Sequence, residues 1–288
     1  LDVDGNGTSD LVLQHRSGEW NLSTMNGSTI TAEHKLDLNN DPDWIAVGRN
    51  DYDGDGKADI LTRNLATGEW HIALMNGDSI KSEGQPSMTA NLDWQVAGKG
   101  DVLLRNLDGR WYQYFLDGTG VGSTARPGLP KDLNTSIAST GDFNGDGKTD
   151  VLTRADDGAW HLYHMNGGDI EADNAISMKK SLDWQVVSSG DFDGNERDDL
   201  LMRYKNGNWL IYQFDGFSVK TPDFLELTDD LDWQVASTGD FDGDGDTDIL
   251  VRSGAMGTWR LYNLNQSIVQ STENVALTSD LDWIVPRS

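Results

Sequence analysis

The hydrophobic residues of this chain fall in short stretches that are separated by glycine, asparagine and aspartate. In residues 184–232 these stretches are WQVVSSG (184–190), DLLMRY (199–204), NWLIYQF (208–214) and a weaker one near FLELT (224–228). They are rich in valine, isoleucine, leucine, tyrosine and tryptophan, which is typical of β-strands in hairpins. No segment shows a helical period long enough for a stable helix. The pattern therefore predicts units of four short strands.

The pattern returns about every 49 residues, which is a period typical of propeller blades and solenoids. A G-x-W motif marks each unit, and the position 24 residues after its tryptophan opens the next unit. The G-x-W residues are Trp20, Trp70, Trp111, Trp160, Trp209 and Trp259. The opening residues are Trp44, Trp94, Thr135, Trp184, Trp233 and Trp283. Spacing this constant predicts one structural unit repeated six times.

Radial repetition of four-stranded sheets is a β-propeller, which protects the sheet edges. The segment LDWIV around Trp283 opens a seventh copy, and joining Ser288 to Leu1 would continue it with the usual spacing. An open solenoid does not explain this fit. We therefore predict an all-β, six-bladed propeller as a single domain over residues 1–288. We expect it to close by pairing the C-terminal strand with the N-terminal blade.

A nine-residue acidic loop precedes an apolar stretch in five of the units. The copies are DVDGNGTSD from Asp2, DYDGDGKAD from Asp51, DFNGDGKTD from Asp142, DFDGNERDD from Asp191 and DFDGDGDTD from Asp240. Oxygen-bearing side chains alternate with glycines, which is how a backbone folds around a hard cation such as calcium. The loops therefore predict about five structural calcium sites. The alternative is that they are solvated Asp-Gly turns without metal.

The third unit departs from this pattern. It lacks eight residues between Gly100 and Asp101, and the acidic loop is lost with them. The stretch VLLR then continues normally, and Thr135 replaces the opening tryptophan of the next unit. We expect the third blade to keep its strands without a metal loop, so that the wall around blades three and four differs from the rest.

Composition narrows the class of partner. The chain has 48 Asp and Glu against 22 Lys and Arg, a net charge of −26, and no basic stripe for phosphates, which excludes nucleic acid. It contains no cysteine and no apolar run long enough to span a bilayer, so we expect no membrane insertion. Calcium loops of this kind fill where calcium is plentiful, which indicates a secreted or cell-surface, extracellular protein.

Units of the form LDWQV…GDFDGDGKTDVLTR…G-x-W-x-x-Y-x-M-N-G resemble the FG-GAP/VCBS repeats of integrin α-chain propellers and of many bacterial surface proteins. The resemblance covers essentially the whole chain. Its W-x-x-Y-x-M-N-G ending is similar to propellers of biofilm-matrix adhesins and to a fungal lectin group with calcium loops. The family implies a calcium loop between the first and second strands of each blade, on one face, with ligands usually meeting the opposite face.

The resemblance also implies which residues bind calcium: the first, third, fifth and ninth side chains of each loop, and the carbonyl of the seventh residue. In loop order these are Asp2, Asp4, Asn6, Thr8 and Asp10; Asp51, Asp53, Asp55, Lys57 and Asp59; Asp142, Asn144, Asp146, Lys148 and Asp150; Asp191, Asp193, Asn195, Arg197 and Asp199; and Asp240, Asp242, Asp244, Asp246 and Asp248. Glu196 replaces the glycine expected at the sixth position of its loop, where the backbone conformation is costly for other residues. We expect this site to be the weakest.

A recurring arginine at the end of the second strand, together with the opening tryptophan of the neighbouring unit, forms a second candidate site. Aromatic rings stack on sugar rings and charged groups bind hydroxyls, so clefts between blades are candidate carbohydrate sites. The candidates are Arg63, Arg105, Arg154, Arg203 and Arg252 with Trp44, Trp94, Trp184, Trp233 and Trp283. Alternatively, the tryptophans pack one blade against the next, and the arginines bridge blades through carboxylates or carbonyls.

Catalysis finds little support, because the chain has no cysteine nucleophile, no H-E-x-x-H and no phosphate-binding glycine loop. We therefore expect a calcium-stabilised propeller that binds a glycan or polysaccharide, as a lectin or matrix adhesin. An integrin-like module for an extracellular protein partner is the first alternative, and the propeller domain of a polysaccharide-degrading enzyme is the second. Propellers host all three functions, so the fold alone does not choose among them.

Overall fold

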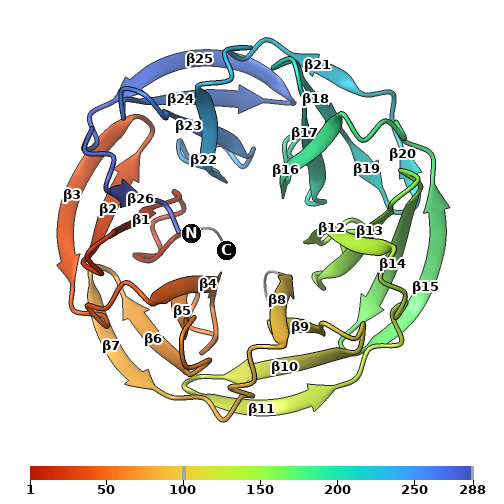
Figure 1. The fold of residues 1–288 in the computed structure, drawn as a ribbon. Coiled ribbons are helices and arrows are strands. Elements are labelled where there is room, and N and C mark those ends of the chain that lie inside the picture. The colour runs from red at the N-terminus through yellow and green to blue at the C-terminus, as the bar shows by residue number, and fades with distance from the viewer. Residues whose placement is uncertain (99–101, 287–288) are drawn as a thin grey trace.

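Six four-stranded sheets form a closed ring in the computed structural model of the chain, which describes residues 1–98 and 102–286 (Figure 1). In each sheet the strands follow one another from the centre of the ring to its rim, as in the order β4-β5-β6-β7. The prediction of an all-β, six-bladed propeller is confirmed. Within the described residues, no helix has the length and apolar character needed to span a lipid bilayer.

The first three blades have the strand pattern that the sequence predicts. Blade one contains β26 (Trp283–Ile284), β1 (Leu11–His15), β2 (Trp20–Asn26) and β3 (Thr29–Leu36). Blade two contains β4 (Trp44–Asn50), β5 (Asp59–Asn64), β6 (Trp70–Asn76) and β7 (Ser79–Gly84). Blade three contains β8 (Trp94–Gly98), β9 (Val102–Asn106), β10 (Trp111–Asp117) and β11 (Gly120–Ala125). The Gly100–Asp101 junction, where the third acidic loop is missing, lies outside the described residues.

The last three blades follow the same order. Blade four contains β12 (Thr135–Gly141), β13 (Asp150–Ala155), β14 (Trp160–Asn166) and β15 (Asp169–Ile176). Blade five contains β16 (Trp184–Gly190), β17 (Asp199–Tyr204), β18 (Trp209–Tyr212) and β21 (Asp223–Leu225), with the added hairpin β19 (Phe214–Asp215) and β20 (Ser218–Val219). Blade six contains β22 (Trp233–Gly239), β23 (Asp248–Ser253), β24 (Trp259–Asn265) and β25 (Ile268–Val275).

The ring closes within blade one. The C-terminal strand β26 pairs antiparallel with β1, with His15 opposite Trp283 and Gln14 opposite Ile284. Figure 1 accordingly shows β26 beside β1 in the blade at the N-terminus. The predicted closure by the C-terminal strand is confirmed.

The hydrophobic core lies between neighbouring blades. The second strands are buried on both faces, which is why they read as continuous apolar runs; in β17, Leu200, Leu201 and Met202 are fully buried. The second residue of each acidic loop joins this core, as Phe143 of blade four does when it packs against Phe214 of blade five with ring centroids 4.8 Å apart. Each blade therefore depends on its neighbour to bury its apolar face.

Blade five differs from the predicted pattern in its outer strands. The expected stretch NWLIYQF is divided between β18 and the β19–β20 hairpin, and the weak strand near FLELT is reduced to the three residues of β21. Pro222 immediately precedes β21, and because proline has no N–H it cannot continue a ladder of hydrogen bonds toward the hairpin. The interruption is therefore local to this blade.

Candidate metal loops and a cationic aromatic cleft

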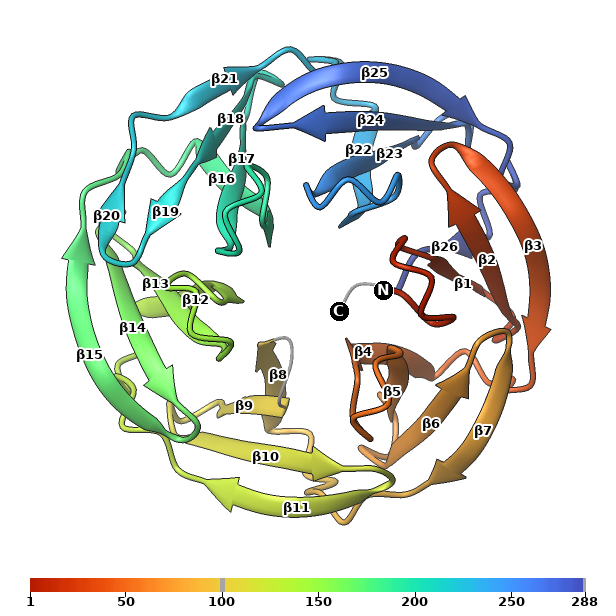
Figure 2. The same cartoon turned by 180° about the vertical axis from the view of Figure 1, so that it is seen from behind.

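The acidic loops lie at one end of the inner strands, on the face seen in Figure 2, where they gather around the centre of the ring. In blades two, four, five and six the loop joins the first strand to the second, and in blade one it leads into β1. In four loops the first, third and ninth carboxylates converge, with one oxygen of each within 4.8 Å of the others. These triplets are Asp2, Asp4 and Asp10; Asp51, Asp53 and Asp59; Asp191, Asp193 and Asp199; and Asp240, Asp242 and Asp248.

The ninth aspartate anchors its loop to the blade. The two oxygens of Asp199 accept hydrogen bonds from the backbone N–H groups of Phe192 (3.2 Å) and Phe214 (2.9 Å). The ninth aspartates of the other four loops are bound in the same way, and all five are almost fully buried. Burial raises the pKa of Asp10 to about 6, that of Asp150 and Asp248 to about 7 and that of Asp199 to about 8; it also raises the pKa of Asp59. Repulsion from the other loop aspartates adds to these pKa shifts.

The fifth and seventh residues of the loops lie outside these triplets. The fifth side chain accepts a hydrogen bond from the backbone N–H of the seventh residue in every loop, for example Asp55 from Lys57 at 3.0 Å. Asp55 also pairs with Lys81 of β7, which bridges it to Asp53 at 3.0 Å and 2.8 Å. Side chains at the seventh position contact groups outside the triplet, as Lys57 does at Asn76. The seventh side chain is therefore engaged with groups other than the three converging carboxylates.

The loop of blade five shows why a cation fits these sites and why its own backbone is strained. One carboxylate oxygen of Asp193 (Oδ1) is buried without a hydrogen-bond partner in the described part of the chain. Three converging carboxylates of this kind match the oxygen ligands that calcium prefers. Glu196 has a φ of 64°, a left-handed conformation that favours glycine. The expectation that a costly backbone conformation is required at this position is confirmed, whereas the weakness of the site stays a prediction.

Neighbouring loops are joined by backbone hydrogen bonds. The eighth residue of one loop donates its N–H to the carbonyl of the first aspartate of the preceding loop. The pairs are Asp198 to Asp142 (2.7 Å), Thr247 to Asp191 (2.6 Å), Ser9 to Asp240 (2.6 Å) and Ala58 to Asp2 (2.7 Å). The loops of blades four, five, six, one and two therefore form one continuous arc, which is interrupted at blade three.

The recurring arginines clamp each blade to the segment that opens the next one. Arg203 of β17 lies over the ring of Trp209, 4.4 Å from its centroid, and donates hydrogen bonds to the carbonyls of Trp233 (2.6 Å) and Asp230 (2.9 Å). Arg63, Arg105, Arg154 and Arg252 make the equivalent contacts. In blade one, Gln14 takes this place and binds the carbonyl of Trp44. The scaffold role considered for these arginines matches this geometry.

The six G-x-W tryptophans complete the clamp. Each is buried and donates its indole N–H to the carbonyl 19 residues later, at 2.7–3.2 Å. The glycine of the motif is held as closely: Gly207 has a φ of 100°, and a Cβ atom there would lie 1.8 Å from the carbonyl oxygen of Asp229. The motif therefore serves packing between a hairpin and the linker to the next blade.

The opening tryptophans contact side chains of their own blades. Four of them pack against rings, with these distances between ring centroids: Trp44 and His71, 6.2 Å; Trp94 and Tyr112, 6.1 Å; Trp184 and Tyr204, 5.0 Å; and Trp283 and His15, 5.1 Å. The fifth, Trp233, has the guanidinium carbon of Arg260 4.4 Å from its ring centroid. Trp184 and Trp233 are buried, whereas Trp44, Trp94 and Trp283 are partly exposed. The clamp arginines thus meet these tryptophans through backbone carbonyls, and the two side chains of the predicted sugar site do not come together.

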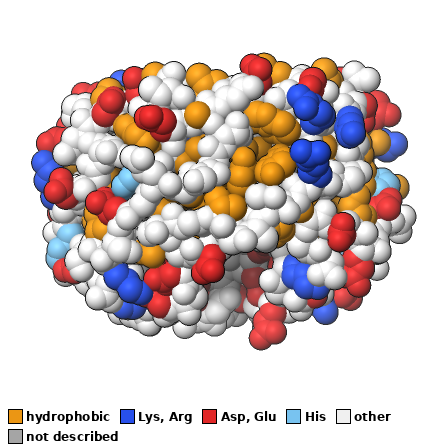
Figure 3. Space-filling model, turned by 90° about the horizontal axis from the view of Figure 1, so that it is seen from below, with side chains coloured by type: hydrophobic (Ala, Val, Ile, Leu, Met, Phe, Trp, Pro, Cys, Tyr) orange, Lys and Arg blue, Asp and Glu red, His pale blue; other side chains and the backbone are white. Residues whose placement is uncertain are grey.

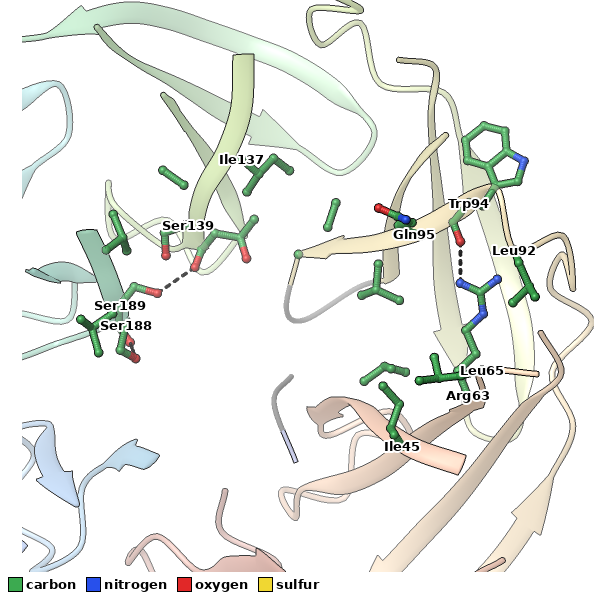
Figure 4. A pocket seen from close by; sticks show the side chains of 18 residues that line it. Ile45, Arg63, Leu65, Leu92, Trp94, Gln95, Ile137, Ser139, Ser188 and Ser189 are labelled. Carbon is green, nitrogen blue, oxygen red and sulfur yellow. Dashed lines mark hydrogen bonds between the residues drawn. The ribbon is translucent and has the colours of Figure 1, made fainter. Parts of the chain in front are cut away.

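At a central cavity of about 650 Å³, Figure 4 shows that the side chains of a clamp arginine and an opening tryptophan lie apart. Arg63 donates to the carbonyl of Trp94, while the indole of Trp94 points away from the cavity. The described lining consists mainly of apolar and small hydroxyl side chains, such as Ile45, Ile137 and Ser188, and Arg63 is its charged residue. This lining therefore offers no pair of carboxylates for glycosidase chemistry.

Blade three carries a smaller cleft of about 450 Å³ on its outward side, defined by Trp94, Arg110, Tyr112, Arg126 and Lys131; we call it the blade-three cleft. Trp111, Tyr114, Thr89, Pro127 and Gly128 complete its lining. Figure 3 views the ring from the side on which β10 and β11 lie, and shows hydrophobic side chains gathered there with Lys and Arg side chains along one edge. Arg110, Arg126 and Lys131 were not among the predicted site residues, although the sequence carries a signal: Arg110 occupies the G-x-W position held by Glu19 and Glu69 in blades one and two.

Comparison with known proteins places the chain by its repeats. Similar solved structures include BBS1N in complex with ARL6DN (15% identity, 94% of this chain and 78% of that chain, TM-score 0.45). They also include the C-terminal WD40 domain of Sif2 (12%, 97% and 86%, 0.48) and BamB from Moraxella catarrhalis (15%, 96% and 89%, 0.39). The search of curated proteins gave no match. The FG-GAP-like repeat matches residues 2–62, 93–153, 142–202 and 191–251, which together span more than half of the sequence. The chain therefore belongs to the family of FG-GAP-like repeat proteins.

Proposed function

We propose that this chain is a calcium-braced propeller that acts outside the cell and binds carbohydrate in the blade-three cleft. The observation that carries the proposal is the cleft itself, in which the partly exposed rings of Trp94 and Tyr112 lie 6.1 Å apart beside unburied polar groups. Its volume of about 450 Å³ lies in the range of small-molecule sites. Aromatic faces with polar groups at their edge suit the mixed apolar and hydroxyl surface of a sugar ring.

The proposed calcium ions would brace the face of the ring that carries the acidic loops, which is the face seen in Figure 2. Each would be held by the first, third and ninth side chains of a loop and by the carbonyl of the seventh residue. Positive charge there would offset the cost of burying the ninth aspartate, which the raised pKa of Asp199 reflects. The inter-loop hydrogen bonds would pass this bracing from blade to blade. Calcium is abundant outside cells, which supports the proposed extracellular location.

A glycan array probed with the labelled protein in millimolar calcium tests the proposal. We expect saturable binding to a related set of glycans, and loss of that binding in Tyr112→Ala. His71→Ala is the matched control, because His71 occupies the equivalent position in blade two and packs against Trp44 as Tyr112 packs against Trp94. Circular dichroism would establish that both variants are folded. A blank array from folded wild-type protein would contradict the carbohydrate function.

A protein partner is the second candidate. Propeller domains of FG-GAP-like repeats typically mediate protein interactions. The leucines that lie two residues before the opening position of a unit are exposed at the ends of the inner strands opposite the acidic loops, by 41–65% of their surface. They are Leu92, Leu133, Leu182, Leu231 and Leu281. Exposed apolar side chains repeated around one face are typical of an interaction surface, and a blank glycan array would favour this candidate.

A further inference from the structure

The blade-three cleft is positively charged in a strongly acidic chain. Its described lining contains Arg110, Arg126 and Lys131 and no carboxylate, whereas the whole chain has 48 acidic and 22 basic residues. The guanidinium carbon of Arg110 lies 5.6 Å from the ring centroid of Trp94, and that of Arg126 lies 5.8 Å from the ring centroid of Tyr112. Each guanidinium therefore lies over one of the two aromatic rings to which the proposed function assigns the sugar.

In blade one, the two positions equivalent to Arg110 and Arg126 carry opposite charges. Glu19 precedes the G-x-W tryptophan and Lys35 follows it by 15 residues, and the two side chains form an ion pair at 3.1 Å. Blade three has arginine at both positions, Arg110 and Arg126. Arg110 immediately precedes β10 and Arg126 immediately follows β11, two strands that pair, and like charges at such neighbouring positions repel each other. The two arginines therefore gain most when a negative group lies between them.

The structure leaves these cations available to a ligand. Arg110 binds the carboxylate of Asp108 at 2.8 Å, but both side chains are more than half exposed, and such surface pairs contribute little. The side chains of Arg126 and Lys131 form no hydrogen bond and no ion pair within residues 1–98 and 102–286. Arg126 makes a cation–π contact with the Tyr112 ring. An incoming anion would therefore have little to displace.

We infer that the blade-three cleft binds an acidic saccharide, with a sugar ring against Trp94 and Tyr112 and its carboxylate held between Arg110 and Arg126. The inference rests on the proposed carbohydrate function and adds the chemical class of the sugar. Guanidinium groups bind carboxylates through two parallel hydrogen bonds, a geometry that neutral sugars do not match. The compact shape of the cleft suits one or two sugar rings better than an extended acidic peptide.

Titration calorimetry with paired ligands tests the inference. The probes are disaccharides and trisaccharides that carry a uronic acid, each compared with its neutral methyl ester, in millimolar calcium. We expect the acid to bind about tenfold more tightly than the ester, a factor that corresponds to about 1.4 kcal/mol. Arg126→Ala should weaken binding of the acid by about the same factor. Raising the salt concentration from about 0.05 M to about 0.3 M should weaken it as well, because the contact is electrostatic.

Lys35→Ala is the matched control, since it removes the same charge from the equivalent position in blade one, and it should leave binding unchanged. Equal binding of acid and ester would overturn the inference and leave the proposed function standing. Undiminished binding of the acid by both Arg110→Ala and Arg126→Ala would overturn its location. Binding of a polyglutamate peptide as tight as that of the uronate, and lost in Arg126→Ala, would assign the cleft to acidic peptides instead. Failure of folded protein to bind any saccharide would overturn the proposed function as well.

Discussion

Replacing Arg203 by alanine tests the clamp between blades five and six. Arg203 is 7% exposed, its guanidinium lies over the ring of Trp209, and it donates to the carbonyls of Trp233 and Asp230. Trp209 belongs to blade five and Trp233 opens blade six, so one side chain joins two sheets. The substitution removes both hydrogen bonds and the ring contact, and it leaves two carbonyls without this donor.

The expected loss in the free energy of unfolding is about 3 kcal/mol. A hydrogen bond from a charged donor contributes about 1.5–3 kcal/mol when buried, the second and less buried bond contributes less, and the cation–π contact adds about 1 kcal/mol. These contributions overlap, so their sum is an upper bound. For a chain of this size, about 3 kcal/mol corresponds to a fall in Tm of about 5 °C. Arg203→Gln should lose about half as much, because Gln14 shows that glutamine can bind the same carbonyl in blade one.

Urea unfolding at fixed calcium, followed by circular dichroism, would measure these differences at equal slopes. Arg16→Ala is the control: Arg16 is 68% exposed and forms an exposed ion pair with Asp282 at 3.4 Å, so its loss should cost less than about 0.5 kcal/mol. Two results would refute the reasoning. One is an Arg203→Ala variant within about 0.5 kcal/mol of wild type, and the other is an Arg203→Gln variant as unstable as Arg203→Ala.

Four further predictions follow from the loops and the motif. Chelation by EDTA should lower Tm by several degrees in a melting curve, because bound calcium stabilises only the folded state; an unchanged curve with confirmed metal removal would contradict the structural role. Glu196→Gly should raise the free energy of unfolding by about 0.5–1 kcal/mol, as relief of left-handed strain exceeds the entropy that glycine adds to the unfolded chain, whereas Glu196→Ala should not. Gly207→Ala should destabilise by more than about 3 kcal/mol in urea unfolding, since its Cβ would lie 1.8 Å from a carbonyl oxygen. In calcium, hydrogen exchange measured by mass spectrometry should be faster in β8 and β9 than in β16 and β17, and equal rates would show that the missing loop does not matter.

The repeat allowed the architecture to be predicted because spacing alone carries it. A constant 24-residue interval from each G-x-W tryptophan to the next opening position predicts blades of equal size. The segment around Trp283 opens a further unit that the loop from Asp2 continues with the usual spacing, and this fit predicts that the ring closes. The fifth blade shows the limit of this reasoning. Its hairpin β19–β20 interrupts a pattern that the other blades keep, and the sequence did not predict it. The outer strand of this blade was predicted only as a weak strand near residues 224–228.

The ligand-binding residues were harder to predict, for two physical reasons. Recurrence of an arginine looks the same whether it binds sugar or scaffold, and the groups that Arg203 binds are backbone carbonyls, which the sequence does not distinguish. The blade-three cleft joins Trp94, Arg110 and Arg126, which are 16 residues apart in sequence, and only the register of β8 to β11 brings them together. The usable signal was a change of charge within an otherwise regular position.

Blade three combines two departures from the repeat, a missing acidic loop and a pair of arginines in place of an ion pair. Within the described residues, the loop-to-loop hydrogen bonds link blades four, five, six, one and two and leave out blade three. The eight missing residues include most of the aspartates that the acidic loops of the other blades carry, while the sequence keeps Asp101 at the ninth position. Screening confines electrostatic repulsion to about 8–10 Å at physiological salt, so the local charge of a blade matters more than the net charge of −26. In the blade-three cleft, arginine stands at both positions that form an ion pair in blade one, and the described lining contains no carboxylate, so an anionic ligand meets local positive charge there in spite of the acidic chain.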